Sequence, residues 1–202
     1  MKLRNAEKRL LIAVSQIIEN EGFSKIGVNK IAKQAKCDKV LIYRYFGGLE
    51  GLLAAWAKDN DFYTLAYQAH SERVTKAESS EDIIKLTQTV LLKQLNFLRT
   101  NKLMQELLAW ELSGNSTFRS IQDERERNGF KLQEELEKKL GKESKDVRMF
   151  ITILIASINY IVLATRQYRI FNGIDFSNPE AWELCKQTIY KYIRALFENI
   201  LK

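Results

Sequence analysis

The sequence predicts an all-α protein of about nine helices. Its 202 residues include one proline and nine glycines, the residues that most often interrupt a helix, so long helices are expected. Apolar side chains recur at three- and four-residue steps along most of the chain, as they do on the buried face of a helix. Hydrophobic residues make up 46% of the chain, which is enough to build a core without disulfides or metal ions.

The sequence pattern of residues 1–47 predicts three helices in the arrangement of a helix-turn-helix unit. The first is expected over about 6–20, and two short helices follow over about 28–35 and 39–45. The turn between the short helices is Lys36-Cys37-Asp38, and the Asp38 carboxylate can cap the third helix. Two short helices joined by a tight turn and supported by a longer helix form a unit whose last helix fits the major groove of DNA.

Six more helices are expected in residues 48–202. The first, over about 49–71, starts beside the helix-turn-helix unit and reaches the rest of the chain, so it is the natural mechanical link. The others are expected over about 81–100, 102–113, 116–140 and 144–171, and from 178 to the end after a loop at 172–177. Asn178-Pro179-Glu180 is a typical helix start.

The positive charge is concentrated at the N-terminal end. Residues 1–60 hold eleven Lys and Arg against six Asp and Glu, whereas the other 142 residues contribute only +2 to the net charge of +7. A basic head on a nearly neutral body indicates a polyanion as the partner of the head.

The sequence indicates a cytoplasmic protein without a membrane partner. Cys37 and Cys185 lie far apart and are expected to be reduced thiols rather than a disulfide. Gln16 and Glu19 interrupt the apolar stretch near the N-terminus, which favours an amphipathic helix over a signal peptide; attachment of this helix to a membrane surface is the weaker alternative. Met149–Ala164 is the most apolar segment, but it is shorter than the ~18 to 20 residues of a membrane span, so we expect its own protein to cover most of it.

No pattern in the sequence supports an enzyme, a metal site or a bound cofactor. His70 is the only histidine, and no second histidine or cysteine stands at ligand spacing from it. A glycine-rich phosphate loop, a nucleophile elbow and a plausible catalytic triad are all missing from the sequence. His70 is therefore expected to have a surface or structural role.

The head contains a motif made of Gly22-Phe23, residues 28–35 and 41–46, and Glu50-Gly51-Leu52-Leu53, with Ile42-Tyr43-Arg44-Tyr45-Phe46 as its most specific part. By this motif the head, over residues about 5–53, resembles that of the TetR family of transcriptional regulators. The resemblance implies a DNA-binding domain at 1–47 and a ligand-binding and dimerisation domain at 48–202. The function it implies is a homodimeric repressor that a small, largely apolar effector releases from a double-stranded DNA operator.

Three departures from the family pattern affect the head. The family usually has Gly-Val-Ser in the turn, so Lys36 is expected to adopt the left-handed conformation in place of a glycine. Leu49 stands where the family tends to have a phosphate-binding lysine, so that contact is not carried over. Gly27 replaces the capping threonine of the second helix. Leu49 and the altered turn motivate an alternative, a helical sensor or interaction protein of the same fold that no longer binds DNA.

Seven residues are expected at the DNA. By the resemblance, the two tyrosines donate their hydroxyls to phosphate, with core packing as the alternative for one ring. The basic residues suit phosphates or guanine edges, the asparagine a phosphate or a base edge, and the valine a thymine methyl, with solvated surface as the alternative. The seven are Lys25, Asn29, Lys39, Val40, Tyr43, Arg44 and Tyr45.

Two further sets of residues are predicted in the body. The last helix has a broad apolar face, and the helix before it is apolar nearly all round, so a four-helix interface between two subunits is expected, with packing inside one subunit as the alternative. Its predicted residues are Trp182, Ile189, Ile193, Leu196 and Phe197. The candidates for lining an apolar effector pocket are Phe97, Met104, Trp110, Phe130, Asn159 and Tyr160.

Overall fold

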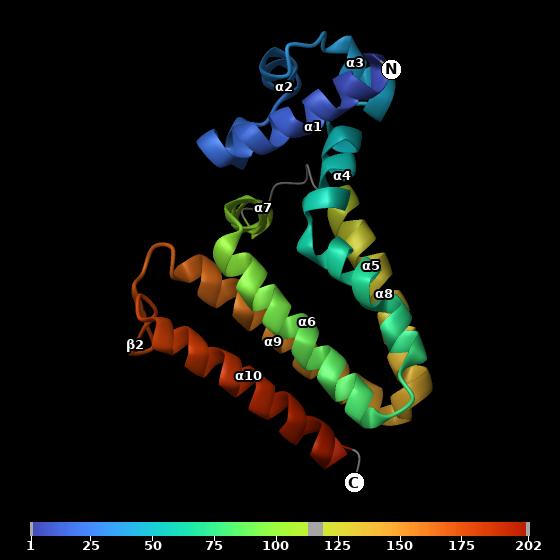
Figure 1. The fold of residues 1–202 in the computed structure, drawn as a ribbon, viewed down its shortest axis with the longest axis vertical. Coiled ribbons are helices and arrows are strands. Elements are labelled where there is room, and N and C mark those ends of the chain that lie inside the picture. The colour runs from blue at the N-terminus through green and yellow to red at the C-terminus, as the bar shows by residue number, and fades with distance from the viewer. Residues whose placement is uncertain (1, 113–118, 201–202) are drawn as a thin grey trace. The chain divides into compact units, whose positions relative to one another are not determined.

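The computed structural model describes residues 2–112 and 119–200, and within them it confirms the all-α fold (Figure 1). These residues form ten α-helices and one short two-stranded sheet. The α-helices are α1 (Lys2–Glu21), α2 (Val28–Gln34), α3 (Val40–Phe46), α4 (Leu49–Asn60), α5 (Phe62–Lys76), α6 (Ser80–Thr100), α7 (Lys102–Leu112), α8 (Arg119–Leu140), α9 (Ser144–Ala164) and α10 (Pro179–Ile200). Short 3-10 helices lie at η1 (Phe23–Lys25) and η3 (Gly141–Glu143), and the sheet is formed by β1 (Ile170–Phe171) and β2 (Ile174–Asp175). The expected helix end at Ser113 and helix start at Ser116 lie outside the described residues.

The chain divides into two compact units. One unit is formed by Met1–Leu65 with Asn101–Glu126, and the other by Ala66–Thr100 with Arg127–Lys202. The first unit therefore combines the three N-terminal helices with α4, α7 and the first part of α8. The predicted boundary at residue 47 separates a DNA-binding domain from a ligand-binding and dimerisation domain. It describes function rather than packing, and it stays a prediction.

The helix expected over 49–71 is in fact two helices that meet at Asp61. The backbone of Asp61 is extended (φ −82°, ψ 119°), which ends α4. The Asp61 carboxylate Oδ2 accepts hydrogen bonds from the backbone N and the Oγ1 of Thr64, both at 2.9 Å, and so caps the start of α5. Aspartate is among the preferred N-cap residues, because its short carboxylate satisfies amide groups that have no partner inside the helix.

The second unit is built around α6, which packs against both α9 and α10 (Figure 1). Its core contains leucines of α6 and also two buried amides whose polar atoms are satisfied. Gln88 Nε2 donates to the Tyr190 carbonyl at 2.9 Å, and Gln94 Nε2 donates to Asn159 Oδ1 at 2.9 Å. These bonds join α6 to α10 and to α9. Separating the helices would leave buried amides without partners, which is costly.

A β-hairpin stands where the end of a helix and a loop were predicted. Helix α9 ends at Ala164 instead of 171, and β1 pairs with β2 in antiparallel register, with Ile170 opposite Asp175 and Phe171 opposite Ile174. Asn172 and Gly173 at the tip both have positive φ angles, 50° and 77°. An Asn-Gly pair with two positive φ angles makes the two-residue turn that matches the twist of a hairpin. The prediction for 165–177 overlooked this local signal.

We expect Gly173→Ala to lower the free energy of unfolding by about 1 to 2 kcal/mol, because alanine is strained in the left-handed region. A Cβ at Gly173 would meet nothing within 4 Å, so backbone strain alone is tested. The matched control is Gly129→Ala in α8, where a Cβ also meets nothing within 4 Å and the glycine has no positive φ. There alanine is expected to stabilise by about 0.5 to 1 kcal/mol. Urea denaturation measures both changes, and an equal effect of the two substitutions would contradict this account.

Candidate nucleic-acid interface

The helix-turn-helix is held together by a small apolar core within the first unit. Ile31 of α2 and Ile42 of α3 are fully enclosed, together with Leu10 and Ile18 of α1. Trp56 of α4 is also buried, and its indole Nε1 donates to Ser15 Oγ of α1 at 2.9 Å. The apolar stripes that predicted these helices are therefore the faces that meet, which fixes α3 relative to α1, α2 and α4.

The turn between α2 and α3 has the geometry that its sequence predicts. Lys36 is left-handed with φ 51°, which confirms the expectation drawn from the missing glycine. The Cys37 amide donates to the Ala32 carbonyl at 3.0 Å, and Asp38 Oδ1 accepts from the Val40 amide at 2.9 Å. Asp38 therefore caps α3 as predicted, and the turn directs the outer face of α3 away from the core.

Glycines set the connection from α3 to α4. Gly47 is left-handed (φ 74°) and its amide donates to the Tyr43 carbonyl at 2.9 Å, which ends α3. A Cβ at Gly51, in the first turn of α4, would overlap the carbonyl oxygen of Phe46. Any side chain at residue 51 would therefore push α4 away from α3. This contact gives a steric reason for the glycine in the Glu50-Gly51-Leu52-Leu53 motif.

Six of the seven side chains predicted to contact DNA are exposed. Val40 and Tyr43 on α3 are 59% and 57% exposed, although both have large apolar groups. Lys25, Asn29, Lys39 and Arg44 are also exposed. Tyr45 is half-buried, and its ring lies edge-on to Phe46 at 6.4 Å, so this tyrosine contributes partly to the core. Within the described chain, the side-chain polar groups of Lys25, Asn29, Lys39, Tyr43 and Arg44 have no hydrogen-bond or ion-pair partner.

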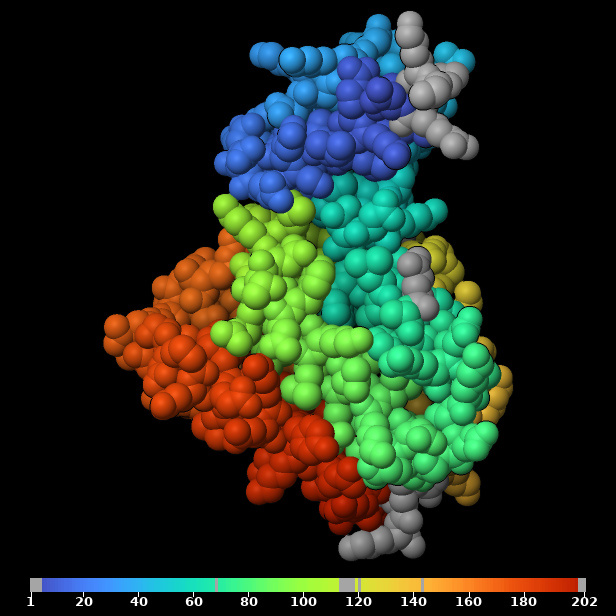
Figure 2. All heavy atoms as spheres, viewed as in Figure 1, coloured from blue at the N-terminus to red at the C-terminus, as the bar shows by residue number. Residues whose placement is uncertain are grey.

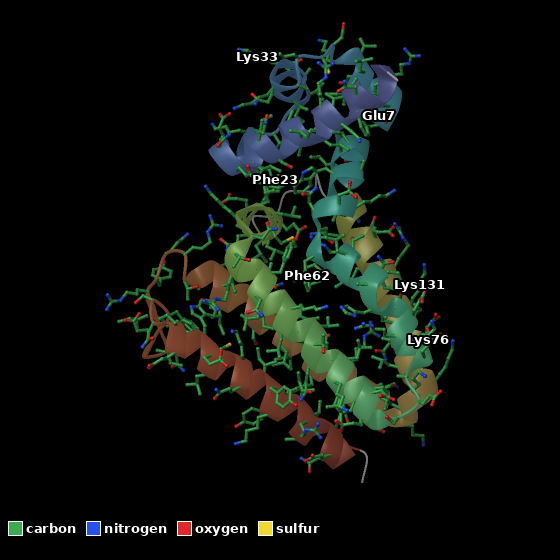
Figure 3. All side chains as sticks on the ribbon, in the orientation of Figure 1. Glu7, Phe23, Lys33, Phe62, Lys76 and Lys131 are labelled. Carbon is green, nitrogen blue, oxygen red and sulfur yellow. The ribbon has the colours of Figure 1, made fainter. Side chains whose placement is uncertain are left out.

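The same surface contains basic residues that the prediction did not include. Lys33 of α2 is exposed and points outward in Figure 3, and Lys36 in the turn is exposed as well. Figure 2 shows several side chains projecting from the lighter blue segment that contains α2 and α3. Lys30, in contrast, forms an ion pair with Glu21. The polar face of the second helix was the signal that could have placed Lys33 at the interface.

The helices α1 to α3 and the tight turn between α2 and α3 form a domain of the helix-turn-helix class. Residues 11–56 match the family model described as bacterial regulatory proteins of the tetR family, so the N-terminal part of the chain is a TetR-family domain. This confirms the resemblance predicted for residues about 5–53. A search of curated proteins found no match to this sequence.

Solved structures of regulators share the fold of nearly the whole chain. The chain is similar to NalD, the secondary repressor of the MexAB-OprM multidrug efflux pump in Pseudomonas aeruginosa (TM-score 0.64, 16% identity, 95% of this chain and 96% of that one). It is also similar to a transcriptional regulator from Aquifex aeolicus VF5 (TM-score 0.60, 16% identity, 95% and 99% covered). A TetR family regulator from Marinobacter aquaeolei VT8 gives a TM-score of 0.58 at 20% identity, with 95% and 97% covered. The chain therefore has the TetR-type fold in both its units.

A cluster of three buried charges lies in the first unit, at the junction of α4 and α5. Asp61 is fully buried, and Arg125 of α8 donates its Nε to Asp61 Oδ1 at 2.9 Å and pairs with the same oxygen through Nη2. Arg125 Nη1 donates to Glu111 Oε2 of α7 at 2.8 Å, and the side chain of Glu111 is only 8% exposed. The cluster, which the sequence analysis did not foresee, joins three segments of the chain.

Burial raises the pKa of Glu111 above its ordinary value of 4.5, the charge of Arg125 opposes this rise, and that of Asp61 adds to it. The Glu111 Oε1 atom is buried and has no hydrogen-bond partner among the residues that the structure describes. Burial alone would lower the pKa of Arg125, but its contacts with Asp61 and Glu111 raise it above the ordinary value, so Arg125 stays charged. Two carboxylates thus share one guanidinium, and the ionised cluster carries one surplus negative charge.

We expect Glu111→Gln to flatten the dependence of stability on pH. Because the folded-state pKa of Glu111 lies above the unfolded value, the folded protein binds this proton more readily, and Glu111 lowers the free energy of unfolding as pH rises from about 4.5 through the folded pKa. In the variant this loss disappears, so its stability relative to the wild type grows with pH. Urea denaturation at several pH values measures the difference. The control Glu126→Gln, an exposed glutamate of α8, is expected to follow the wild-type profile.

His70 lies on α5, in the part of that helix that belongs to the second unit. Its side chain is buried, and burial lowers its pKa, with smaller contributions from Lys93 and Arg73. Within the part of the chain that the structure describes, no three His, Cys, Asp or Glu residues lie close enough to hold a metal ion.

The six residues predicted to line an effector pocket fall into both units. Met104 is buried in the core of the first unit, and the Trp110 ring stacks on Phe23 at 6.4 Å. In the second unit Phe97 is half-buried, and Asn159 accepts a hydrogen bond from Gln94. Phe130 and Tyr160 are 59% and 58% exposed, so their assignment to an enclosed pocket is corrected: their rings lie at the surface of the single chain.

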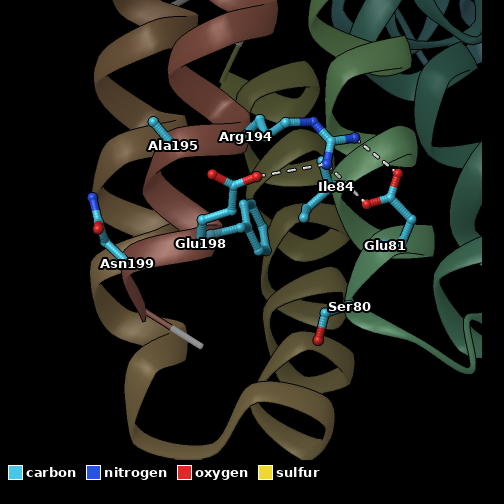
Figure 4. Close-up of a pocket in the computed structure, with 8 residues that line it drawn as sticks. Ser80, Glu81, Ile84, Arg194, Ala195, Glu198 and Asn199 are labelled. Atoms are coloured by element: carbon cyan, nitrogen blue, oxygen red, sulfur yellow. Dashed lines mark hydrogen bonds and ion pairs between the residues drawn. The ribbon is translucent and has the colours of Figure 1, made fainter. Parts of the chain in front are cut away.

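A shallow depression of about 680 Å³ lies between the first turn of α6 and the last turns of α10 (Figure 4). None of the six predicted residues lines it. Its central cation, Arg194, donates Nη2 to Glu81 Oε1 at 2.8 Å and Nη1 to Glu81 Oε2 at 3.1 Å. The hydrogen bond from Arg194 lowers the pKa of Glu81. Because these charges already pair with each other, the depression offers little to a small ligand.

Four of the five residues predicted at a dimer interface are buried inside the subunit. Trp182, Ile189, Ile193 and Phe197 pack within the second unit, and only Leu196 is half-exposed. The Trp182 Nε1 donates to the Phe176 carbonyl at 2.8 Å, and the Arg99 guanidinium lies 4.3 Å from the Trp182 ring centre. The assignment of these four residues is corrected, because the apolar face of α10 covers α6 of its own chain.

Other apolar side chains on α9 and α10 are exposed instead. On α9 the exposed residues Met149, Ile153 and Tyr160 follow at four- and seven-residue steps, so they form one stripe. On α10 Leu184 and Tyr192 are exposed. Among the described residues, α9 is the one helix long and apolar enough to cross a membrane, with a mean hydropathy of 2.0 and 17% of its apolar window buried. The prediction that its own subunit covers most of this helix is therefore wrong, although one such helix is weak evidence for a membrane.

Proposed function

We propose that this protein is a DNA-binding transcriptional regulator that contacts its operator through α3. The observation that carries the proposal is the exposed face of α3. Val40, Tyr43 and Arg44 lie there on a basic head, and the packing of the head leaves them available to a partner. The match of residues 11–56 to the tetR family supports this role.

Each exposed residue has a role that its chemistry allows. The Tyr43 hydroxyl donates to a phosphate and fixes the register of the head, and Tyr45 contributes a second, partly buried hydroxyl. Lys39 and Arg44 read base edges, of which guanine O6 and N7 suit them best, and Val40 contacts a thymine methyl. Lys25 and Asn29 at η1 and α2 contact the phosphate backbone beside the groove.

The experiment is the selection of bound duplexes from a random library, followed by a gel shift of the selected operator. Wild-type protein is expected to retard it. Tyr43→Phe should weaken binding to all duplexes alike, because the lost hydroxyl reads no sequence. Arg44→Ala should in addition relax the preference at particular positions by ~1 to 3 kcal/mol. No selected sequence and no retarded band would contradict the proposal.

We further propose that the chain acts as a homodimer through the exposed stripe of α9 and the neighbouring surface of α10. A helix face that exposes Met149, Ile153 and Tyr160 in one row is the kind of surface that a second copy covers in an isologous four-helix arrangement. Two subunits also bring two heads to half-sites about one helical turn apart.

Ile153→Glu is expected to convert the dimer to a monomer in analytical ultracentrifugation, because it places a charge inside the interface. Phe130→Glu, at an equally exposed ring on α8, is the matched control and should remain dimeric. A wild-type monomer that sediments with anionic vesicles would instead identify α9 as a membrane-binding helix.

We propose that the protein represses transcription in the cytoplasm and that a small, largely apolar effector relieves this repression. NalD, which shares the fold, is described as a repressor of an efflux pump. Release requires that the effector bind more tightly to a conformation that fits the operator less well. The expected result is a retarded band that disappears when the effector is added.

The second candidate function is a helical sensor of the same fold that no longer binds DNA. Leu49 in place of a phosphate-binding lysine and the left-handed Lys36 favour it. This alternative predicts that the library selection returns no operator, while the dimer test gives the same result.

A further inference from the structure

In the buried cluster of Asp61, Arg125 and Glu111, both carboxylate oxygens of Asp61 accept two hydrogen bonds each. Asp61 Oδ1 accepts from two nitrogens of Arg125, and Oδ2 accepts from the N and Oγ1 of Thr64. The guanidinium also lies 4.9 Å from the ring centre of Tyr63. Asp61 is thereby held from two sides, by α8 through Arg125 and by the first turn of α5 through Thr64.

Stability alone does not account for such a cluster. The energy of removing several charges from water often exceeds what their mutual attraction returns, and well-packed apolar residues in their place are frequently as stable or more stable. Here the surplus negative charge and the unpartnered Glu111 Oε1 raise that penalty further. The charges instead specify geometry. The guanidinium donates its hydrogen bonds in one plane and in fixed directions, so the carboxylates of Asp61 and Glu111 must lie at defined positions around it.

That arrangement fixes the C-terminal end of α4. The other parts of α4 are tied to the head, since Gly51 lies against the Phe46 carbonyl of α3 and Trp56 donates to Ser15 of α1. A twelve-residue helix transmits a change at one end to the other, because its backbone hydrogen bonds make it stiff. A displacement of Asp61 would therefore displace the contacts of Gly51 and Trp56, which set the orientation of α3.

We propose that Arg125 is a positioning residue for DNA binding, which acts through Asp61 by fixing α4 and thereby the direction of α3. This inference rests on the proposed function. Arg125 contacts no DNA in this account, and its effect on affinity comes from holding α4 against α7 and α8.

The test separates positioning from stability by removing all three charges together. The triple variant D61N/E111Q/R125M leaves no unpaired buried charge, and asparagine at residue 61 keeps an oxygen to cap α5. Its unfolding midpoint in urea is expected to stay near that of the wild type, while its affinity for the selected operator falls about tenfold, within the range typical of coupling between separate sites. Glu126→Gln, at an exposed glutamate of α8, is the matched control, because it raises the net charge by one as the triple variant does, and it should keep wild-type affinity at equal salt.

A second variant keeps the test decisive if the triple variant does not fold. Arg125→Lys retains the charge but cannot bond two carboxylates with a planar fork, so it should fold and bind the operator several-fold more weakly. Wild-type affinity in a folded triple variant or in Arg125→Lys would overturn the inference and leave the proposed function intact. Failure of the wild-type protein to bind any duplex would overturn both.

Discussion

The affinity of the protein for duplex DNA is expected to fall steeply as salt is added. A protein that neutralises phosphates with Lys and Arg releases the counterions bound there, and the logarithm of the binding constant falls by about 0.9 per phosphate for each unit of log salt. Each head presents Lys25, Lys33, Lys36, Lys39 and Arg44 as exposed cations. If a dimer makes six to ten phosphate contacts, the affinity should drop by roughly 10³ to 10⁵ between about 50 and 200 mM salt.

Two variants separate the charged contacts from the neutral ones. Lys25→Met should reduce the salt slope by about two in a dimer, because each subunit loses one phosphate contact that releases a cation. Tyr43→Phe should weaken binding at every salt concentration without changing the slope, since a hydroxyl displaces no counterion. Fluorescence anisotropy of a labelled duplex measures both effects. A flat salt dependence would show that the basic head does not meet the phosphate backbone.

Arg125→Leu is expected to lower the free energy of unfolding by about 3 to 5 kcal/mol, because it leaves two buried carboxylates without their cation. The side chains of Asp61 and Glu111 are 0% and 8% exposed, so water can replace little of the lost interaction. Proteins of this kind are stable by only about 5 to 15 kcal/mol, so the variant should be close to unfolding.

Arg169→Leu is the matched control, since it also leaves an aspartate without the arginine that pairs with it. Arg169 Nε lies 3.1 Å from Asp175 Oδ2, but the two side chains are 68% and 38% exposed. An exposed pair contributes about 0 to 1 kcal/mol, so this substitution should change the unfolding midpoint little. Similar losses in the two variants would mean that the Arg125 cluster is open to solvent.

Much of the head could be predicted because its signals are local. The apolar steps in 6–20 and 28–35, the glycine before the second helix and the Asp38 cap each involve residues only a few positions apart. The left-handed conformation of Lys36 was expected from the family resemblance, because the family usually has a glycine at this position. Local signals were also present at Asp61 and at Asn172-Gly173. At Asp61 the strong apolar pattern led to the prediction of one long helix, and at Asn172-Gly173 a loop was predicted instead of a hairpin turn.

The effector pocket and the dimer surface were predicted less well, because helical periodicity does not say which partner an apolar face meets. Trp182 and Phe197 looked like interface residues, yet they pack on their own subunit, while Met149 and Ile153 are exposed. Tyr160 and Phe130 were expected inside and lie at the surface.

The sequence by itself determined the helices, the helix-turn-helix with its exposed tyrosine and arginine, and the excess of positive charge at one end. These properties depend on spacing, capping and composition, which act over a few residues. Only the tertiary structure decided that Asp61 meets Arg125, 64 residues further along the chain, and which apolar faces stay uncovered. Such pairings depend on how whole helices pack, and the energy of each depends on burial that no short segment has alone.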